Sequence, residues 1–505
     1  MDLEPDACYR AIQTRDARFD GRLFVAVHTT GIYCRPICPA RTPKRENVDF
    51  YATAAAAQEA GFRPCLRCRP ETSPDLAAWR GTSNTVSRAL SLIEDGALDL
   101  GDVEALADRL GVGERQLRRL FRQHLGASPV AVAQTRRVLL AKQLIHETRL
   151  SMAEVAEASG FGSVRRFNET FQQLFNRPPA SLRRGATATD PAAGAVKVRL
   201  PYKPPYDWET MLGFLAVRAI PGVEQVSGRR YQRTIALNGE VGMITVEPGA
   251  GNRLDVTVRF PRLKALPAII ARIRRVFDLA ADPLVIGGQL SNDPHLARLV
   301  AARPGLRVPG AWDGFELAVR AVLGQQITVG AAIVIAGKLT AAYGEPLPTE
   351  LATTEGLTHV FPTPERLAAA DIAGHGLMPG ARARAINGLA AAVVADPLIF
   401  GPKRGLDEAI AQLKSLSGIG EWTAQYIAMR ELREPDAFPA ADIGLMRALA
   451  DAEGLRPTPA ELLARAEAWR PWRAYAAQHL WASDPIPPQK AKTPLKTATD
   501  DKRAA

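Results

Sequence analysis

The chain has 505 residues, which at roughly 150 residues per domain predicts three or four domains. Hydrophobic residues make up 47% of it and charged residues 23%, a balance typical of globular proteins that excludes a largely disordered chain. The formal net charge of +11, with a pI near 9.6, favours a polyanion such as nucleic acid as the partner over an acidic small molecule.

The sequence shows no segment typical of export or membrane insertion. The first residues, MDLEPDACYR, lack the basic and then apolar regions of a secretory signal. The apolar run from Ile327 to Gly337 stops at Lys338, short of the roughly 18 residues that a membrane-spanning helix needs. We therefore expect a soluble, cytoplasmic protein with no membrane partner.

Hydrophobic periodicity and composition predict a multidomain, mainly α-helical protein. The expected order is a small α+β unit with the cysteines, an all-α arginine-rich unit, a linker, an α+β unit with an antiparallel sheet, an all-α unit and a disordered tail. These segments cover, in that order, residues 1–80, 82–185, 186–195, 196–285, 286–485 and 486–505.

The cysteines gather at one end of the chain. All five lie within the first 68 residues, which favours a local metal or thiol site over a disulfide framework. Cys34 and Cys38 form one close pair, and Cys65 and Cys68 form a second pair. Two such pairs suit one tetrahedral Zn²⁺ held by four thiolates. Such a site is either a structural zinc knuckle or a reactive one, because a zinc-bound thiolate can attack an alkyl carbon.

The residues around these cysteines resemble the N-terminal methyl-acceptor domain of Ada, the adaptive-response methyltransferase. The resemblance rests on DGRLFVAVHTTGIYCRPICPAR, RENVDFYATAAAA and AGFRPCLRC. It implies that Cys34 irreversibly accepts a methyl group from a DNA methylphosphotriester, with the other three cysteines as the remaining zinc ligands. It also implies DNA contacts by Thr30, Arg41 and Arg63. Pro39 stands where the family can have an arginine, and Cys8 lies outside the motif as a spare thiol.

An internal repeat follows the cysteine-bearing unit. Each copy has a short apolar helix, a glycine-containing turn and an arginine-rich helix, ERQLRRLFRQHL in the first and SVRRFNETFQQLF in the second. We expect two helix-turn-helix motifs that present Arg115, Arg118, Arg119, Arg165 and Arg166 to DNA. Ser151 and Glu154 predict a capping box, and Ser128-Pro129 predicts the start of a connecting helix.

The alternative for this unit is a helical bundle with solvated arginines. The second copy, SMAEVAEASGFGSVRRFNETFQQLFNRPPASLRR, resembles the AraC-type family of DNA-binding domains. Together with the Ada-like unit, this resemblance implies a methylation-responsive transcription activator whose partners are promoter DNA and RNA polymerase.

Near the end of the chain, LKSLSGIGEWTAQYIAM predicts two helices joined by a glycine hairpin. Gly418 and Gly420 would let this backbone approach a DNA phosphate closely. A glycine hairpin alone is weak evidence, but the downstream segment AFPAADIGLMRAL adds one carboxylate, Asp442. With WDGFELAVRAVLGQQITVGAA and WRPWRAYAAQHLW, the combination resembles the AlkA-like 3-methyladenine glycosylase II branch of the helix-hairpin-helix superfamily.

This resemblance implies a glycosylase that flips a base out of DNA and removes it. Asp442 would stabilise the oxocarbenium-like sugar, although it could also be only a surface helix cap. Trp422, Tyr426 and Trp481 are the candidate rings of the base pocket, although single rings usually belong to a core. Trp422 stands where glycosylase/lyase relatives carry lysine, so we expect a monofunctional enzyme. Gln326 stands where relatives carry an apolar wedge.

Three hypotheses follow from these patterns. The first is a fusion of methyl acceptor, DNA-binding activator and alkylbase glycosylase. The second is a transcription regulator whose glycosylase-like half binds DNA without catalysis. The third is a glycosylase with a purely structural zinc module.

Overall fold

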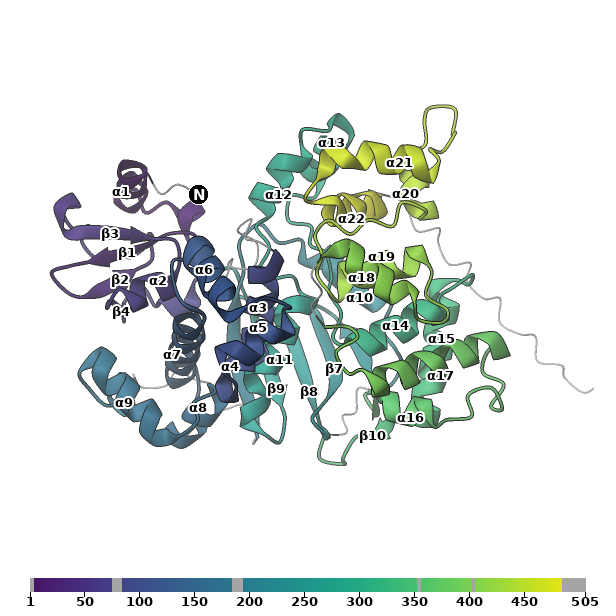
Figure 1. Ribbon diagram of the computed structural model, residues 1–505, viewed down its shortest axis with the longest axis horizontal. Coiled ribbons are helices and arrows are strands. Elements are labelled where there is room, and N and C mark those ends of the chain that lie inside the picture. The colour runs from purple at the N-terminus through teal and green to yellow at the C-terminus, as the bar shows by residue number, and fades with distance from the viewer. Residues whose placement is uncertain (1–3, 75–83, 184–193, 352–355, 402–404, 484–505) are drawn as a thin grey trace, which may run out of the picture.

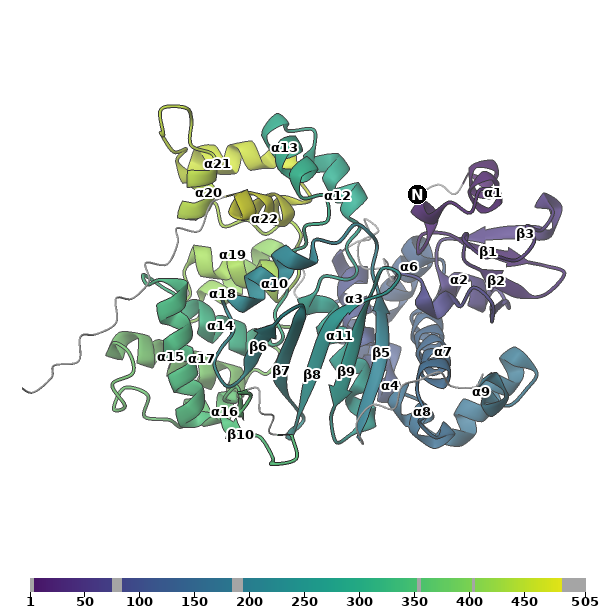
Figure 2. The same ribbon diagram turned by 180° about the vertical axis from the view of Figure 1, so that it is seen from behind.

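The computed structural model describes residues 4–74, 84–183, 194–351, 356–401 and 405–483. Along its longest axis, the cysteine-bearing unit and the helices that follow it occupy one end (Figure 1). The C-terminal helices occupy the other end, and a five-stranded sheet stands between the two groups (Figure 2). All of the predicted tail and most of the predicted linker lie outside the described residues.

The N-terminal unit is a four-stranded sheet with the order β3-β1-β2-β4. Its pairs are antiparallel except β2 with β4, which run parallel. Thr53 caps the following helix by accepting from the amide of Ala56, and its hydroxyl also donates to the carbonyl of Leu125 in the next unit. The elements are α1 (Pro5–Gln13), β1 (Phe24–Val27), β2 (Ile32–Cys34), β3 (Val48–Tyr51), α2 (Ala54–Glu59) and β4 (Arg63–Pro64), with short 3₁₀ turns between them.

The next unit is wholly helical in its described part, and its repeat is the one that the sequence predicts. Ser151 and Glu154 form the expected capping box, and Ser128 caps the long connecting helix at Pro129. Buried apolar residues recur at every fourth position of both arginine-rich helices. The helices are α3 (Asn84–Glu94), α4 (Ala97–Leu100), α5 (Val103–Arg109), α6 (Glu114–Leu125), α7 (Pro129–Glu147), α8 (Met152–Ala158) and α9 (Val164–Phe175).

The central sheet has the order β5-β9-β8-β7-β6, and its pairs are antiparallel, as the alternating pattern predicts. Phe161, Phe167 and Phe171 of the second repeat belong to the same apolar cluster as the buried face of this sheet. The elements are β5 (Ala195–Pro201), α10 (Trp208–Ala216), β6 (Glu224–Ser227), β7 (Arg230–Leu237), β8 (Glu240–Gly249), β9 (Arg253–Arg259) and α11 (Leu266–Val276).

The C-terminal unit packs its helices around one apolar core. Besides the predicted helices it holds a two-stranded sheet, β10 (Glu345–Pro346) with β11 (His359–Val360). The helices are α12 (Pro283–Leu290), α13 (Pro294–Ala302), α14 (Gly314–Leu323), α15 (Val329–Tyr343), α16 (Pro364–Ala368), α17 (Gly380–Ala395), α18 (Leu406–Lys414), α19 (Glu421–Arg430), α20 (Ile443–Ala448), α21 (Pro459–Ala466) and α22 (Arg473–Ser483).

Buried polar contacts join the cysteine-bearing unit to the C-terminal half. The Nζ atom of Lys203, which is 3% exposed, donates to the carbonyls of Ala17 and Arg18 at 2.9 and 2.8 Å. Arg22 forms an ion pair with Asp282, the residue that caps α12. The two halves therefore dock through specific contacts as well as through the chain that links them. Within the described residues, no helix is long and apolar enough to cross a membrane.

Candidate functional sites

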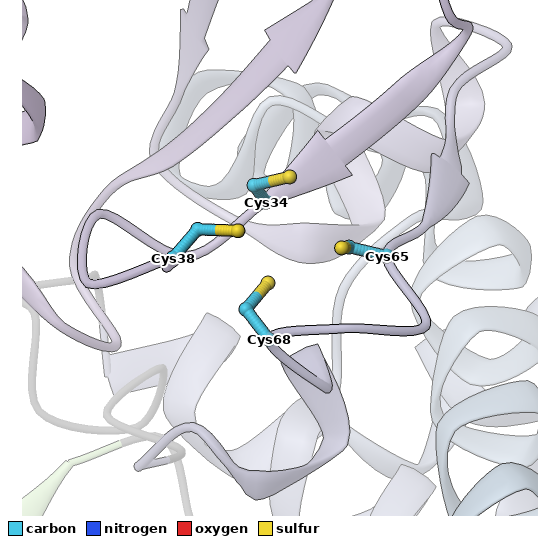
Figure 3. A group of neighbouring side chains, drawn as sticks. All are labelled: Cys34, Cys38, Cys65 and Cys68. Atoms are coloured by element: carbon cyan, nitrogen blue, oxygen red, sulfur yellow. The ribbon is translucent and has the colours of Figure 1, made fainter. Parts of the chain in front are cut away.

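Four cysteine side chains converge at one edge of the N-terminal sheet. Cys34 ends β2 and Cys65 follows β4, so the parallel pairing of these strands brings both residues to the same edge. Cys38 and Cys68 lie on the loops that follow, and the four Sγ atoms lie within 4.8 Å of one another (Figure 3). Four soft sulfur ligands at this spacing fit one tetrahedral Zn²⁺. Cys8, 3% exposed, lies in the same apolar cluster but outside this set.

The surroundings of the cluster favour thiolates. Backbone amides of Arg35 and Arg67 donate to the sulfurs of Cys68 and Cys65 at 3.4 and 3.3 Å. The guanidinium of Arg35 donates to the carbonyl of Cys68 and to Asp20, which fixes the loop between the first two cysteines. Amide donors of this kind stabilise negative sulfur.

Of the residues expected to contact DNA near this cluster, Thr30 and Arg41 lie on loops and Arg63 begins β4. Thr30, in the turn between β1 and β2, is exposed, and the amide of Arg63 donates to the carbonyl of the adjacent Gly31. Arg41 is exposed on the loop after Cys38. The structure thus places the start of β4, at Arg63, beside the turn that carries Thr30.

The predicted DNA-facing arginines of both repeats are exposed, in the first two turns of α6 and in the first turn of α9. Arg118 is paired with Glu114, and Arg165 with Glu169, each on its own helix. Such exposed pairs contribute little free energy and yield readily to a phosphate. Arg118 and Arg166, one from each repeat, line the same hollow of about 590 Å³. Residues of both repeats therefore border one hollow.

The structure places Asp442 at the junction of two helices from the C-terminal unit. Its Oδ2 atom accepts a hydrogen bond from Nε1 of Trp422 on α19, and its Oδ1 atom accepts one from Nε1 of Trp481 on α22, both at 2.8 Å. Oδ1 also accepts the amide of Leu445, so Asp442 caps α20 as well. Asp442 is therefore a helix cap, as the alternative reading expects, and in addition it accepts two indole N–H groups.

The three rings proposed for a base pocket lie around this carboxylate. The rings of Trp422 and Tyr426 are parallel, with centroids 5.1 Å apart and an angle of 8° between their planes. Trp481 meets Tyr426 edge to face at 6.5 Å. All four residues are half-buried, so this wall is open to solvent. Aromatic faces of this kind are surfaces on which a flat, unstacked base can stack.

The loop between α14 and α15, which carries Gln326 and is called the wedge loop, is hydrogen-bonded to the glycine hairpin. Gln325, between α14 and α15, donates from Nε2 to the carbonyl of Gly418 at 2.7 Å. Gly418 has a φ of +82°, and a Cβ there would lie 2.8 Å from that of Ala385, so only glycine fits. Around Gly420 the space is open. Gln326 is exposed with a φ of +59°, which places its side chain at the tip of the loop.

Sequence reasoning missed two arginines beside these rings. Arg430, which is 2% exposed, lies with its Cζ atom 5.3 Å from the ring centroid of Tyr426. Arg218 comes from the distant α10 region and lies 4.0 Å from the ring centroid of Phe214. The spacing of Arg430, four residues after Tyr426 on one helix, was a usable signal, whereas nothing local marks Arg218.

Family models match four successive parts of the chain. They are the metal binding domain of Ada at residues 7–71, a helix-turn-helix domain at 106–185, the AlkA N-terminal domain at 197–313 and the HhH-GPD superfamily of base excision DNA repair proteins at 319–474. A probable bifunctional transcriptional activator/DNA repair enzyme AlkA of Mycobacterium tuberculosis is 44% identical over 482 residues, 95% of this chain and 96% of that one. The chain belongs to the family of bifunctional transcriptional activator/DNA repair enzymes of the AlkA type.

Parts of the chain also match smaller proteins. DNA-3-methyladenine glycosylase 2 of Escherichia coli is 37% identical over 299 residues, 58% of this chain and 99% of that one. The solved structure of a 3-methyladenine DNA glycosylase from Archaeoglobus fulgidus has a TM-score of 0.51 at 23% identity and covers 57% of this chain and 98% of its own, which shows a shared fold. The chain thus combines an Ada-type zinc site, a helix-turn-helix region and a DNA glycosylase unit.

Proposed function

We propose that the C-terminal half hydrolyses the N-glycosidic bond of alkylated bases of the 3-methyladenine type in double-stranded DNA. The observation that carries this proposal is the Asp442 carboxylate, which accepts two indole N–H groups within a wall of three aromatic rings. As the bond to the base breaks, positive charge develops on the sugar, and a fixed carboxylate stabilises it.

Each group around the carboxylate has a separate task in this proposal. The donors from Trp422, Trp481 and Leu445 hold the carboxylate in place, so that little reorganisation is needed during reaction. The ring faces stack on the flipped base, and Gln326 fills the gap that the base leaves. Because position 422 carries an indole and no amine, a Schiff base cannot form there, and the product is an abasic site.

The experiment is a base-release assay on alkylated duplex DNA with the full chain. Asp442→Asn should lower kcat about 100- to 1,000-fold, the range found when one electrostatic contact to a transition state is removed. Asp293→Asn is the matched control, because Asp293 also caps a helix and accepts an indole N–H, from Trp469, but lies outside the ring wall. Full activity of Asp442→Asn would refute the assignment. No release by the wild type would favour a DNA-binding regulator without catalysis.

We also propose that Cys34 accepts a methyl group from a DNA methylphosphotriester. The sulfur forms a bond to the methyl carbon, the carbon–oxygen bond breaks, and the phosphate leaves as a diester anion. When bound, Zn²⁺ keeps the four sulfurs deprotonated and nucleophilic. Methylation removes one negative charge beside Thr30, Arg41 and Arg63, which strengthens binding to DNA phosphates. The helix-turn-helix unit would then hold promoter DNA and present the protein to RNA polymerase in the cytoplasm.

A further inference from the structure

The wedge loop carries two successive glutamines whose surroundings differ. Gln326 is exposed at the tip of the loop and has a φ of +59°, in the left-handed region that residues other than glycine rarely adopt. Gln325 is half-buried and is hydrogen-bonded through both its backbone and its side chain. The contacts of Gln325 therefore bear directly on where Gln326 lies.

Three elements hold Gln325 in place. Its amide donates to the carbonyl of Val322 on α14 at 3.3 Å, and its carbonyl accepts from Nη2 of Arg382 on α17. Its Nε2 atom donates to the carbonyl of Gly418, in the hairpin before α19, at 2.7 Å. A backbone donor, a backbone acceptor and a side chain are thus all engaged, which fixes this end of the wedge loop relative to the hairpin.

The hairpin end of this contact is the part of the chain expected to bind a DNA phosphate. Gly420 caps α19 and has no side chain to occupy the first amides of the helix, which leaves them for an anion. The Nε2 atom of Gln325 also lies 3.5 Å from Oγ1 of Thr423, the neighbour of Trp422 in the chain. One side chain therefore connects the loop that would enter the base stack with the segment that would hold the strand.

We infer that Gln325 is a positioning residue for base extrusion. It holds the wedge loop against the hairpin, so that Gln326 enters the base stack at the point where the hairpin holds the strand. This inference rests on the proposed glycosylase function. Gln325 itself takes part in no bond that forms or breaks, and it acts through Gln326.

The expected effect is on extrusion of the base and not on the first contact with DNA. Moving a base out of the stack costs free energy, which an inserted side chain partly offsets. A wedge loop that shifts relative to the hairpin lowers the fraction of bound DNA whose base is extruded, and kcat falls with that fraction. Binding of undamaged DNA relies on hairpin amides and basic side chains, so it should change little.

The test begins with Gln325→Met, which keeps the length of the side chain but removes the amide donor. By fluorescence anisotropy, the full chain with this change should bind a duplex with a synthetic abasic site about threefold more weakly, as expected for one lost exposed hydrogen bond. The kcat for release of 7-methylguanine should fall by a similar factor, with KM and the affinity for undamaged duplex within about twofold of wild type. Gln289→Met, at an exposed glutamine of α12, is the matched control and should change none of these quantities.

A double variant shows whether Gln325 acts through Gln326. If it does, Gln325→Met combined with Gln326→Ala should bind the abasic duplex no more weakly than Gln326→Ala alone, because no wedge is left to position. Losses that multiply in the double variant would overturn the inference. Equal losses of affinity for undamaged and abasic duplexes in Gln325→Met would overturn it too, since they indicate a general structural role.

The test stands even if Gln325→Met does not fold or the wild type has no glycosylase activity. The amide of Gln325→Asn is one methylene short of the Gly418 carbonyl, so this variant should repeat the pattern, and wild-type affinities in it would overturn the inference. A wild type that releases no alkylated base refutes the proposed glycosylase function. The affinities for the abasic duplex involve no bond cleavage and still decide the role of Gln325.

Discussion

The cysteine cluster encloses its reactive atoms, whereas the Asp442 site leaves its carboxylate at an open wall. Cys34, Cys65 and Cys68 are each at most 9% exposed, and the four sulfurs lie within 4.8 Å of one another. Asp442 is half-buried, and its partners are donors that a reaction leaves unchanged. A site whose own atom takes up the transferred group can be closed around it and act once. A site that acts repeatedly needs side chains that the reaction leaves unaltered and room for the product to leave.

The largest expected effect separates these two modes directly. With excess methylated DNA, the full chain should gain one methyl group and then stop, while base release continues through many turnovers. Cys34→Ser should abolish the adduct of about 14 Da, because an alcohol is not deprotonated there at neutral pH. Mass spectrometry of the N-terminal peptide measures this.

Cys8→Ser is the matched control, since Cys8 is buried nearby but lies outside the four-sulfur set. It should keep full methyl uptake, and base release should stay within about twofold of wild type in both variants. Methyl uptake by Cys34→Ser would contradict the assignment of the acceptor and leave a structural zinc module as the explanation.

The second prediction concerns what holds the closed site in place. Lys142 of α7 is fully buried, and its Nζ atom contacts Glu71 at 2.6 Å and the carbonyl of Cys65 at 2.9 Å. Lys142→Met would leave Glu71 as a buried charge with only Arg69 beside it, at a cost of about 3 kcal/mol. We expect zinc to be released at a clearly lower urea concentration than from the wild type.

Removing the charges of both Lys142 and Glu71 tests whether the unpaired carboxylate causes the loss of stability. Lys142→Met combined with Glu71→Gln should recover most of the loss, because no unpaired charge is then buried. Lys44→Met is the control, since Lys44 is an exposed lysine of the cysteine-bearing unit. If the double variant is as unstable as the single one, the effect comes from lost packing.

A feature can be predicted from the sequence when the residues that form it lie close together along the chain. The cysteine pairs, the capping box at Ser151 and the start of α7 are short-range patterns, and the structure shows all of them. The rings were identified through a family resemblance, and the structure brings them together around Asp442. The four-residue interval between Tyr426 and Arg430 was visible but looked like ordinary helix spacing.

No pattern in the sequence indicates the contacts that join the cysteine-bearing unit to the C-terminal half. Lys203 reaches a carbonyl 186 positions away, and Arg22 an aspartate 260 positions away. These pairs depend on how separately folded units dock, which periodicity does not encode. The same holds for Trp481 and Asp442, whose hydrogen bond depends on the packing of α20 against α22.

The third prediction tests the fixed donors of the open site. Trp422→Phe and Trp481→Phe each keep an aromatic face but remove one N–H donor from Asp442. A hydrogen bond to a charged group contributes about 1.5 kcal/mol or more, so each variant should lower kcat roughly tenfold. Trp469→Phe removes the equivalent donor from Asp293 and should affect stability more than kcat. If all three variants lowered kcat alike, the donors to Asp442 would have no special part in the reaction.

The smallest effect is expected at the tip of the wedge loop. Gln326 is exposed and held in a left-handed conformation by a loop that is bound to the glycine hairpin through Gln325. Gln326→Leu should raise affinity for duplexes with an abasic site about threefold, because an apolar side chain fills the gap with less loss of hydration. Gln326→Ala should lower it by a similar factor, as measured by fluorescence anisotropy. Both changes should leave methyl uptake by Cys34 untouched. Equal affinities in all three proteins would mean that the open site binds extrahelical bases through its ring wall and hairpin without a wedge.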